Sequence, residues 1–215
     1  MRIRVICDPV RQKMRYIPPF RRISSYLIQF FHSRCYSYSF SLGGMMSDPE
    51  IQNEDALFGL LDTHNILHET HEHTAVFTVE EGKDIKAALP GGHTKNLFLK
   101  DKSGQYVLVC ALGNTNIRLN HLHKHIGTKR LSFGKEDALY DLLGVKPGSV
   151  TLFSLINDKN KAVRLILDKA LFDHERVWFH PLRNTASTAI YSSDIKRFVR
   201  ALGREPIIID LTTDT

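Results

Sequence analysis

The chain has 215 residues, of which 42% are hydrophobic and 24% charged, and its formal net charge is +6. That length suits one folded domain with an appendage, and a core of that size needs no disulfide or metal to hold it. The charge is unevenly distributed, since residues 1–47 hold eight Lys or Arg and one acid, whereas residues 48–215 hold 21 basic and 22 acidic residues. The positive excess therefore belongs to the N-terminal extension and says little about what the remaining domain binds.

The N-terminal extension, residues 1–47, is rich in Arg, Ser and aromatic residues, and Pro18-Pro19 interrupts any long helix. It has no apolar run approaching the ~20 residues that span a membrane, so we expect no membrane partner. Its composition fits a mitochondrial transit peptide. The alternative is a start at Met45 or Met46, with the earlier residues a misread upstream sequence, which predicts a cytoplasmic protein. Either way the extension is disordered or targeting-like, and the folded domain is predicted at residues 48–215.

Three cysteines follow no disulfide or zinc pattern, which indicates a reducing compartment. Cys7 and Cys35 lie in the extension, and Cys110 ends an apolar run. Nothing in the neighbouring sequence offers a base that could activate the Cys110 thiol. We therefore expect Cys110 to be a small buried apolar residue.

The folded domain alternates helical and strand patterns along the chain. Apolar spacing, caps and breakers predict helices at 54–61, 78–89, 117–126, 135–143 and 192–202. The first of these is followed by a strand at 66–69, and further short strands are predicted at 131–133, 177–179, 187–191 and 206–210. Two runs around the turn 157–160 predict a hairpin of strands 150–156 and 162–168. Ser192 or Ser193 is expected to cap the last helix. This pattern favours a mixed α/β domain over a doubly wound one.

Another hairpin is predicted where the chain runs from a glycine pair into an apolar segment, residues 91–100. Ser103-Gly104 turns the chain back into a second β-rich run, residues 105–111. Lys95 stands at the mouth of the first strand, beside the glycine loop. A cation there is placed to bind a phosphate or a carboxylate. The alternative is that Lys95 is a solvated charge at a strand start.

Seven histidines form two clusters without zinc-site spacing, so we predict surface histidines and no metal. The clusters are His64, His68, His71 and His73, and then His121, His123 and His125. A His71–His73 pair flanking the glycine loop is an alternative for part of the first cluster.

The window from Lys95 to Lys135 contains Asp101 as its one acid and a clear excess of basic residues. Such an excess is an electrostatic footprint for phosphate. The basic residues of the window are Lys95, Lys100, Lys102, Arg118, Lys124, Lys129, Arg130 and Lys135. The alternative is a solvated face that acids from elsewhere balance in space. Contact with an RNA backbone fits better than reading of duplex sequence, and DNA is not expected.

Two further stretches could line a small pocket. The loop 144–149 follows a helix, and its two glycines and Pro147 predict a fixed backbone that a ligand can approach closely. Gly144 alone is explained equally well as a helix C-cap. The second stretch begins at His180, which could serve as a general base or be a structural histidine. After it comes a polar wall of Asn184, Thr185, Ser187 and Thr188.

Three motifs together carry a resemblance to a known family, and they stand in the family's order: residues 91–100, 144–151 and 178–185. The chain resembles the trans-editing deacylases of the YbaK and prolyl-tRNA-synthetase insertion-domain superfamily. Within it, the chain is most similar to the free-standing prolyl-tRNA-synthetase-associated branch, ProXp-ala. The likeness covers about Glu54 to Leu211.

The resemblance implies a curved, barrel-like mixed β-sheet flanked by helices. It implies hydrolysis of mischarged aminoacyl-tRNA(Pro), most of all Ala-tRNA(Pro), without a metal or cofactor, with the neighbouring ribose hydroxyl helping to activate water. Lys95 would hold the phosphate of the terminal adenosine, and Asn96 and His180 would help to enclose the aminoacyl group. The remaining substrate contacts would come from Gly144, Pro147, Gly148, Ser149, Asn184 and Thr185. Contacts to the tRNA would come from Lys100, Lys102, Arg118, Lys124, Lys129 and Arg130.

The implied partners are the acceptor end of tRNA(Pro) and, transiently, prolyl-tRNA synthetase. Four residues depart from the family pattern: Thr74, Leu152, Ser154 and Arg183. They leave open whether alanine, serine or cysteine is the preferred amino acid. The rival interpretations are a non-catalytic module that binds tRNA or a synthetase, and an unrelated barrel that binds a small molecule.

Overall fold

The computed structural model describes residues 51–75 and 88–211. The helices are α1 (Glu54–Thr63), α3 (Leu119–His125), α4 (Glu136–Leu143) and α5 (Ser192–Ala201), with 3₁₀ helices η1 (Leu152–Ile156) and η2 (Lys169–Asp173). The strands are β1 (His68–Glu72), β2 (Gly92–Asp101), β3 (Tyr106–Leu112), β4 (Leu131–Phe133), β5 (Val163–Asp168), β6 (Arg176–Phe179), β7 (Ala186–Tyr191) and β8 (Ile207–Ile209). None of the helices in these ranges is long and apolar enough to cross a membrane.

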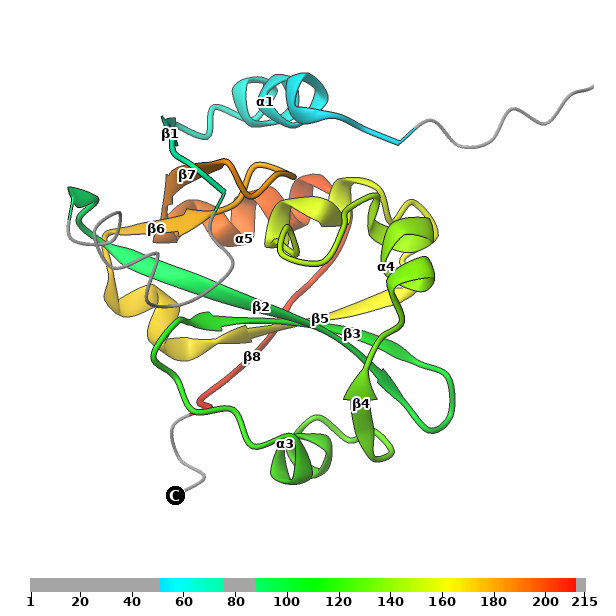
Figure 1. Ribbon diagram of the computed structural model, residues 1–215. Helices are drawn as coiled ribbons and strands as arrows, with labels where there is room; N and C mark the ends of the chain where they lie inside the picture. Colours follow the sequence, from blue (N-terminus) through cyan, green and yellow to red (C-terminus); the bar gives the residue numbers. More distant parts are fainter. Residues whose placement is uncertain (1–50, 76–87, 212–215) are drawn as a thin grey trace, which may run out of the picture. The chain divides into compact units, whose positions relative to one another are not determined.

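The strands form one mixed sheet in the order β1-β7-β6-β2-β3-β5-β8, and β4 also pairs with β2 (Figure 1). β2 is antiparallel to β3 and β4 and parallel to β6. β5 pairs in parallel with β3, and β8 pairs in parallel with β5. At the other end, β7 pairs antiparallel with both β6 and β1. The predicted mixed α/β class is therefore confirmed, with a sheet that stays open between its edges β1 and β8.

Each face of the sheet has its own hydrophobic core. The larger core joins α1, α4, η1 and α5 to residues such as Phe98, Leu108 and Cys110. The alternate residues of the same strands, Leu99 and Val109 among them, pack with α3 in the second core. Figure 1 shows α1, α4 and α5 on one side of the central strands and α3 on the other. Cys110 is fully buried, and burial raises the pKa of its thiol, so its prediction as a small buried residue is confirmed.

The β2–β3 hairpin is confirmed, and a buried carboxylate organises its turn. Asp101 accepts hydrogen bonds from the Ser103 hydroxyl (2.7 Å) and from the backbone N–H groups of Ser103, Gln105 and Lys129 at 2.8–3.0 Å. These donors, the Ser103 hydroxyl first, lower the pKa of Asp101 to about 2. Gly104 takes a positive φ of 97°, which a glycine adopts without steric cost.

The predicted hairpin of 150–156 with 162–168 is wrong in its first limb. Residues 152–156 form the 3₁₀ helix η1, while the second limb is confirmed as β5. The Thr151 hydroxyl accepts a hydrogen bond from the Phe153 backbone (3.3 Å), and the Ser154 hydroxyl donates to the Thr151 carbonyl (2.6 Å). These local bonds stabilise a tight turn, so the apolar run packs as a helix inside the larger core.

Other predictions differ in their boundaries. The first strand is β1 at His68–Glu72 rather than 66–69, because pairing with β7 fixes it, as in the 2.7 Å contact between the Thr70 and Thr188 hydroxyls. Neither Ser192 nor Ser193 caps α5, since Tyr191 holds the cap position without a side-chain bond. Most of the helix predicted at 78–89 lies outside the described residues, as does the extension 1–47.

Candidate functional site

Lys95 and Asn96 are neighbours on β2 and point to opposite faces of the sheet. Lys95 lies opposite Ala111 of β3, and Asn96 lies opposite Cys110. The alternation along β2 places Lys95 on the face of Leu99, and Asn96 on the face of Phe98. The side chains of the two predicted residues therefore lie on two sides of one strand.

The Asn96 side chain is incompletely paired. Its amide nitrogen donates to the Thr94 hydroxyl at 3.3 Å, and that hydroxyl donates to the Trp178 carbonyl at 2.8 Å. Its carbonyl oxygen is buried and has no hydrogen-bond partner in the described part of the chain. An unpaired buried acceptor costs about 1–3 kcal/mol, and such atoms call for a specific explanation. Asn96 thus offers an oxygen that a ligand's hydroxyl or ammonium group could satisfy.

Lys95 carries a half-buried ammonium group. The group donates a hydrogen bond to the backbone carbonyl of Thr115, in the loop after β3. Burial lowers the pKa of Lys95, and the negative charge of Asp168 acts in the opposite direction. The ammonium is thus held by the fold rather than free in solvent.

His180 follows β6 and lies beside His73, which follows β1. Their ring centroids are 6.2 Å apart. Nδ1 of His180 lies 2.9 Å from the Ala186 carbonyl, which can only accept, so the neutral ring carries its proton there and leaves Nε2 as an acceptor. Burial is the main cause that lowers the pKa of His180, and the nearby His73 contributes to the same shift. His180 is therefore neutral at pH 7 and able to accept a proton.

The sequence did not single out His73 for this role. Its Nε2 lies 3.0 Å from the Ser187 hydroxyl, and its Nδ1 lies 2.8 Å from the Thr74 carbonyl. His71 instead contacts Glu69 at 3.2 Å and the edge of the Trp178 ring. The two histidines thus contact different groups, and it is His73 that faces His180. The position of His73 beside His180 follows from the pairing of β1 with β7, which cannot be deduced from the sequence alone.

The polar wall after His180 is tied to α1 and β1. The Arg183 guanidinium bonds Glu54 of α1 at 2.8 Å and Glu72 of β1 at 2.5 Å. It also donates to the Thr185 hydroxyl at 2.7 Å, and the Thr185 carbonyl accepts from the His73 N–H at 2.9 Å. Hydrogen bonds to these carboxylates, that to Glu72 first, raise the pKa of Arg183. Arg183 thereby holds Thr185 beside His73. Asn184, which lies between Arg183 and Thr185 in the sequence, is half-buried.

The loop 144–149 is a helix C-cap followed by a turn. Gly144 has φ 66°, and a Cβ there would lie 2.8 Å from the Asn157 amide nitrogen, so packing explains this glycine. Ser149 N–H donates to the Lys146 carbonyl at 3.0 Å, and Gly148 has φ 87°. Pro147 then precedes Gly148 as expected for a type II turn. Pro147 and Gly148 are exposed and Ser149 is buried.

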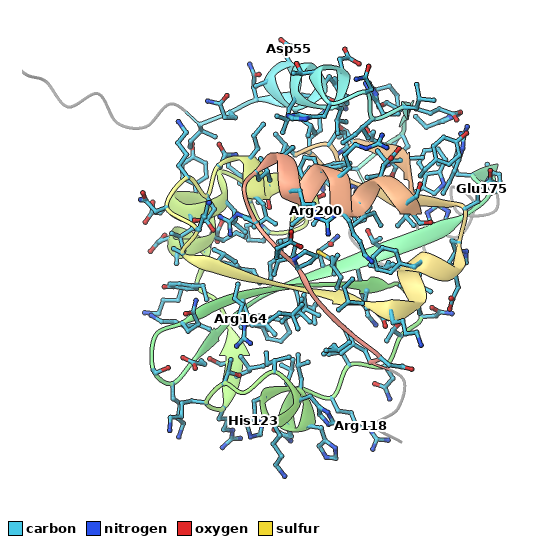
Figure 2. All side chains as sticks on the ribbon, turned by 180° about the vertical axis from the view of Figure 1, so that it is seen from behind. Asp55, Arg118, His123, Arg164, Glu175 and Arg200 are labelled. Carbon is cyan, nitrogen blue, oxygen red and sulfur yellow. The ribbon has the colours of Figure 1, made fainter. Side chains whose placement is uncertain are left out.

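The predicted tRNA-binding residues gather around the β2–β3 turn, α3 and the loop before β4. Lys102, Arg118, Lys124, Lys129 and Arg130 are exposed. The ammonium of Lys100 lies 4.9 Å from the centre of the Tyr106 ring. Within residues 51–75 and 88–211 none of the six forms an ion pair, so the acids of these ranges do not neutralise them by direct pairing. Figure 2 shows Arg118 just before α3 and His123 on α3, with Arg164 of β5 on the adjoining part of the molecule.

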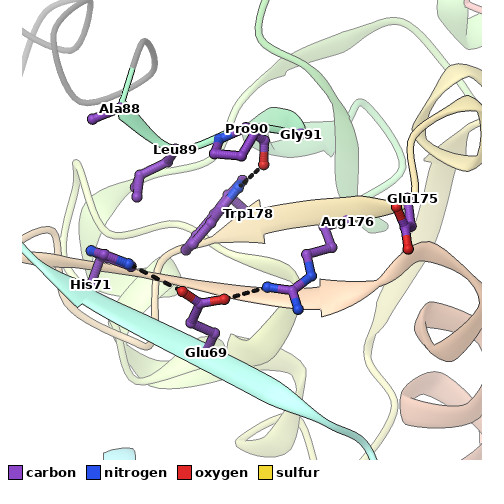
Figure 3. Close-up of a pocket in the computed structure, with 9 residues that line it drawn as sticks. All are labelled: Glu69, His71, Ala88, Leu89, Pro90, Gly91, Glu175, Arg176 and Trp178. Carbon is purple, nitrogen blue, oxygen red and sulfur yellow. Dashed lines mark hydrogen bonds and ion pairs between the residues drawn. The ribbon is translucent and has the colours of Figure 1, made fainter.

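Two of the larger cavities in the described part of the chain are lined mostly by residues outside the predicted set. One, of about 330 Å³, lies between the β2–β3 turn and residues 127–129, with Arg164 in its wall. The other, of about 380 Å³, lies where β1 and β6 meet residues 88–91 (Figure 3). In it Glu69 bonds both His71 and Arg176, and the Trp178 indole donates to the Pro90 carbonyl at 2.9 Å. No three His, Cys, Asp or Glu side chains of the described ranges come together as metal ligands.

Comparisons with known proteins agree with this fold. The sequence profile described as "Aminoacyl-tRNA editing domain" matches residues 73–198. Prolyl-tRNA synthetase associated domain-containing protein 1 of Mus musculus is 41% identical over 147 residues, covering 66% of this chain and 86% of the relative. Prolyl-tRNA editing protein ProX of Acetoanaerobium sticklandii is 33% identical over 163 residues, covering 75% and 99%.

Solved structures share the architecture. A crystal structure described as a candidate trans-editing enzyme for prolyl tRNA synthetase has a TM-score of 0.56 at 18% identity, and the match covers 75% of this chain and 98% of that one. At that identity the likeness shows the fold alone, while the profile and the relatives show the family. The chain belongs to the aminoacyl-tRNA editing domain family.

Proposed function

We propose that this protein hydrolyses the ester bond of mischarged aminoacyl-tRNA(Pro), with alanine as the preferred amino acid. Family membership supports editing of an aminoacyl-tRNA, and the relative named ProX is a prolyl-tRNA editing protein. The observation that carries the proposal is that two consecutive residues of β2 present a half-buried ammonium, that of Lys95, on one face of the sheet and an unpaired, buried oxygen, that of Asn96, on the other. One group suits a phosphate, and the other suits a hydroxyl or an ammonium group.

In this proposal Lys95 binds the phosphate of the terminal adenosine. The Asn96 oxygen accepts a hydrogen bond from the ribose or from the amino group of the substrate. The turn 147–149 and the wall from His180 to Thr185 limit the space for the amino-acid side chain. The exposed cations around α3 contact the RNA backbone, which adds affinity without reading sequence.

The reaction needs little acid–base catalysis because an aminoacyl ester is already activated. The water oxygen attacks the ester carbonyl carbon, the bond from that carbon to the ribose oxygen breaks, and the ribose oxygen takes up a proton. The neighbouring ribose hydroxyl assists the water. Nε2 of His180 can accept the proton that the water loses and return it to the leaving ribose oxygen. Correct placement of water and substrate then supplies most of the rate.

A pocket that admits only small amino acids would also explain the choice of substrate. A synthetase built for proline cannot strongly exclude the smaller alanine, so a second site that admits only small residues removes the error. We propose that prolyl-tRNA synthetase is a transient partner in this task. In this proposal the turn 147–149 and His180 set the amino-acid preference by excluding the proline ring.

The test is a deacylation assay with the full chain and tRNA(Pro) carrying alanine, serine, cysteine or proline. The proposal expects rapid loss of alanine, slower loss of serine and cysteine, and intact Pro-tRNA(Pro). Binding of tRNA(Pro) without any deacylation would instead support a non-catalytic binding module.

A further inference from the structure

Asp168, at the end of β5, is a fully buried carboxylate in line with Lys95. Lys95 lies opposite Ala111 of β3, and Cys110 lies opposite Leu167 of β5, so Ala111 is next to Asp168. The three residues follow one another across three strands and share the face of the second core. The small Ala111 side chain between them leaves room for the lysine to lie across β3.

Thr115 connects the two charged groups. Its hydroxyl donates to Oδ2 of Asp168 at 2.8 Å, and its backbone carbonyl accepts the hydrogen bond of the Lys95 ammonium. Thr115 is itself 5% exposed, and its N–H donates to the Leu112 carbonyl at 3.1 Å, which holds the loop in place. The ammonium and the carboxylate are thus held on either side of one buried residue.

The carboxylate has no cation in direct contact within the described residues. Its other oxygen, Oδ1, accepts from the N–H groups of Ala170 at 3.3 Å and Leu211 at 3.4 Å. Burying an ionised carboxylate among neutral donors is unfavourable unless a compensating charge lies nearby. Lys95 is the group whose pKa the charge of Asp168 raises, against the effect of burial.

We propose that Asp168, acting through Thr115, is a positioning residue that keeps the Lys95 ammonium charged and aimed at its ligand. This inference rests on the proposed role of Lys95 in binding the substrate phosphate. A lysine side chain has many rotamers, and the Thr115 carbonyl together with the carboxylate behind it selects one of them. The same carboxylate offsets the loss of hydration that half-burial imposes on the ammonium.

A purely structural role is the competing explanation, since Asp168 also accepts hydrogen bonds from Ala170 and Leu211. Asp168→Asn distinguishes the positioning role from the structural role, because the amide keeps the side-chain shape and one acceptor oxygen but removes the negative charge. Asp194→Asn is the matched control, because Asp194 is 7% exposed and pairs with Arg197 at 3.0 Å on α5. Thr115→Val, which keeps the backbone carbonyl but removes the hydroxyl, is the second variant in case Asp168→Asn does not fold.

The first measurement is the pKa of Lys95 in the full chain, read by NMR from its side-chain carbon signal and assigned by its loss in Lys95→Arg. The proposal expects that pKa to fall in Asp168→Asn, or in Thr115→Val, and to stay unchanged in Asp194→Asn. An unchanged Lys95 pKa in both folded variants would overturn it. This readout needs no tRNA, so it stands even if the proposed function fails.

The second measurement is kcat/KM for Ala-tRNA(Pro) in a double-mutant cycle. Asp168→Asn is expected to lower kcat/KM roughly tenfold in the wild-type background and to have no effect in a Lys95→Ala background. Equal losses in both backgrounds would show a structural role and contradict the inference. Wild-type protein without deacylation would refute the proposed function alone, and the Lys95 pKa would then decide the inference.

Discussion

Replacing Lys95 by alanine removes the charge that we assign to substrate phosphate. A charge-assisted hydrogen bond contributes about 1.5–3 kcal/mol. Because Lys95 is half-buried rather than fully enclosed, solvent screening favours the lower half of that range. The expected loss in kcat/KM is therefore roughly 10- to 50-fold, since about 1.4 kcal/mol corresponds to a factor of ten.

The assay compares single-turnover deacylation by wild type, Lys95→Ala and Lys95→Arg, with folding checked by circular dichroism. Lys95→Arg should recover only part of the activity, because a planar guanidinium does not replace a compact ammonium against the Thr115 carbonyl. Lys196→Ala is the control, since its ammonium lies over the Phe172 ring near α5, at 5.2 Å, and should have no effect. A folded Lys95→Ala protein with near-normal turnover would refute the reasoning.

Four further predictions rest on the same geometry. His180→Ala should lose less activity than Lys95→Ala. In the wild type, burial lowers the pKa of His180, so the imidazole becomes protonated, and unable to act as a base, only below the usual histidine range. The wild-type rate should therefore show no inflection near pH 6.5. Activity should fall on the alkaline side sooner than for an ordinary lysine, because burial lowers the pKa of Lys95 and deprotonation removes its charge; a wild-type rate that stays constant up to the usual lysine pKa would argue against this. Alanine at Lys124 and Lys129 should weaken tRNA binding and reduce the slope of log affinity against log salt by roughly 0.7–0.9 for each phosphate that the protein no longer neutralises, as measured by filter binding at several salt concentrations. Deletion of residues 1–46 should leave the melting temperature and the deacylation rate unchanged, and insolubility or loss of activity would count against the domain boundary at residue 48.

Sequence reasoning found elements whose signals are local. The β2–β3 hairpin was predictable because Ser103-Gly104 and Asp101 make the turn within a few residues. The end of α4 was predictable because Gly144 adopts the left-handed conformation that closes a helix. The same reasoning failed at η1, since a short run of buried apolar residues has the same appearance in a strand as in a buried helix.

The candidate site was only partly predictable, because its geometry depends on strand pairing. Lys95 and His180 were found by motif, but the motif did not show that Lys95 and Asn96 point to opposite faces. His73 becomes part of the site through the pairing of β1 with β7. Asp168 lies 73 positions after Lys95 in the sequence. The two residues come near each other because β3 is the one strand that lies between β2 and β5 in the sheet. Such registers are set by the packed sheet and not by any short stretch of sequence.

The most direct test of the proposed function is one rate measurement: deacylation of Ala-tRNA(Pro) and Pro-tRNA(Pro) by the full chain and by its Lys95→Ala variant, under identical conditions. We predict that wild type removes alanine and spares proline, and that Lys95→Ala removes alanine at least tenfold more slowly while remaining folded, a factor of about ten being the lower bound worked out above. Equal removal of both amino acids, or an alanine rate that does not depend on Lys95, would contradict the proposed function.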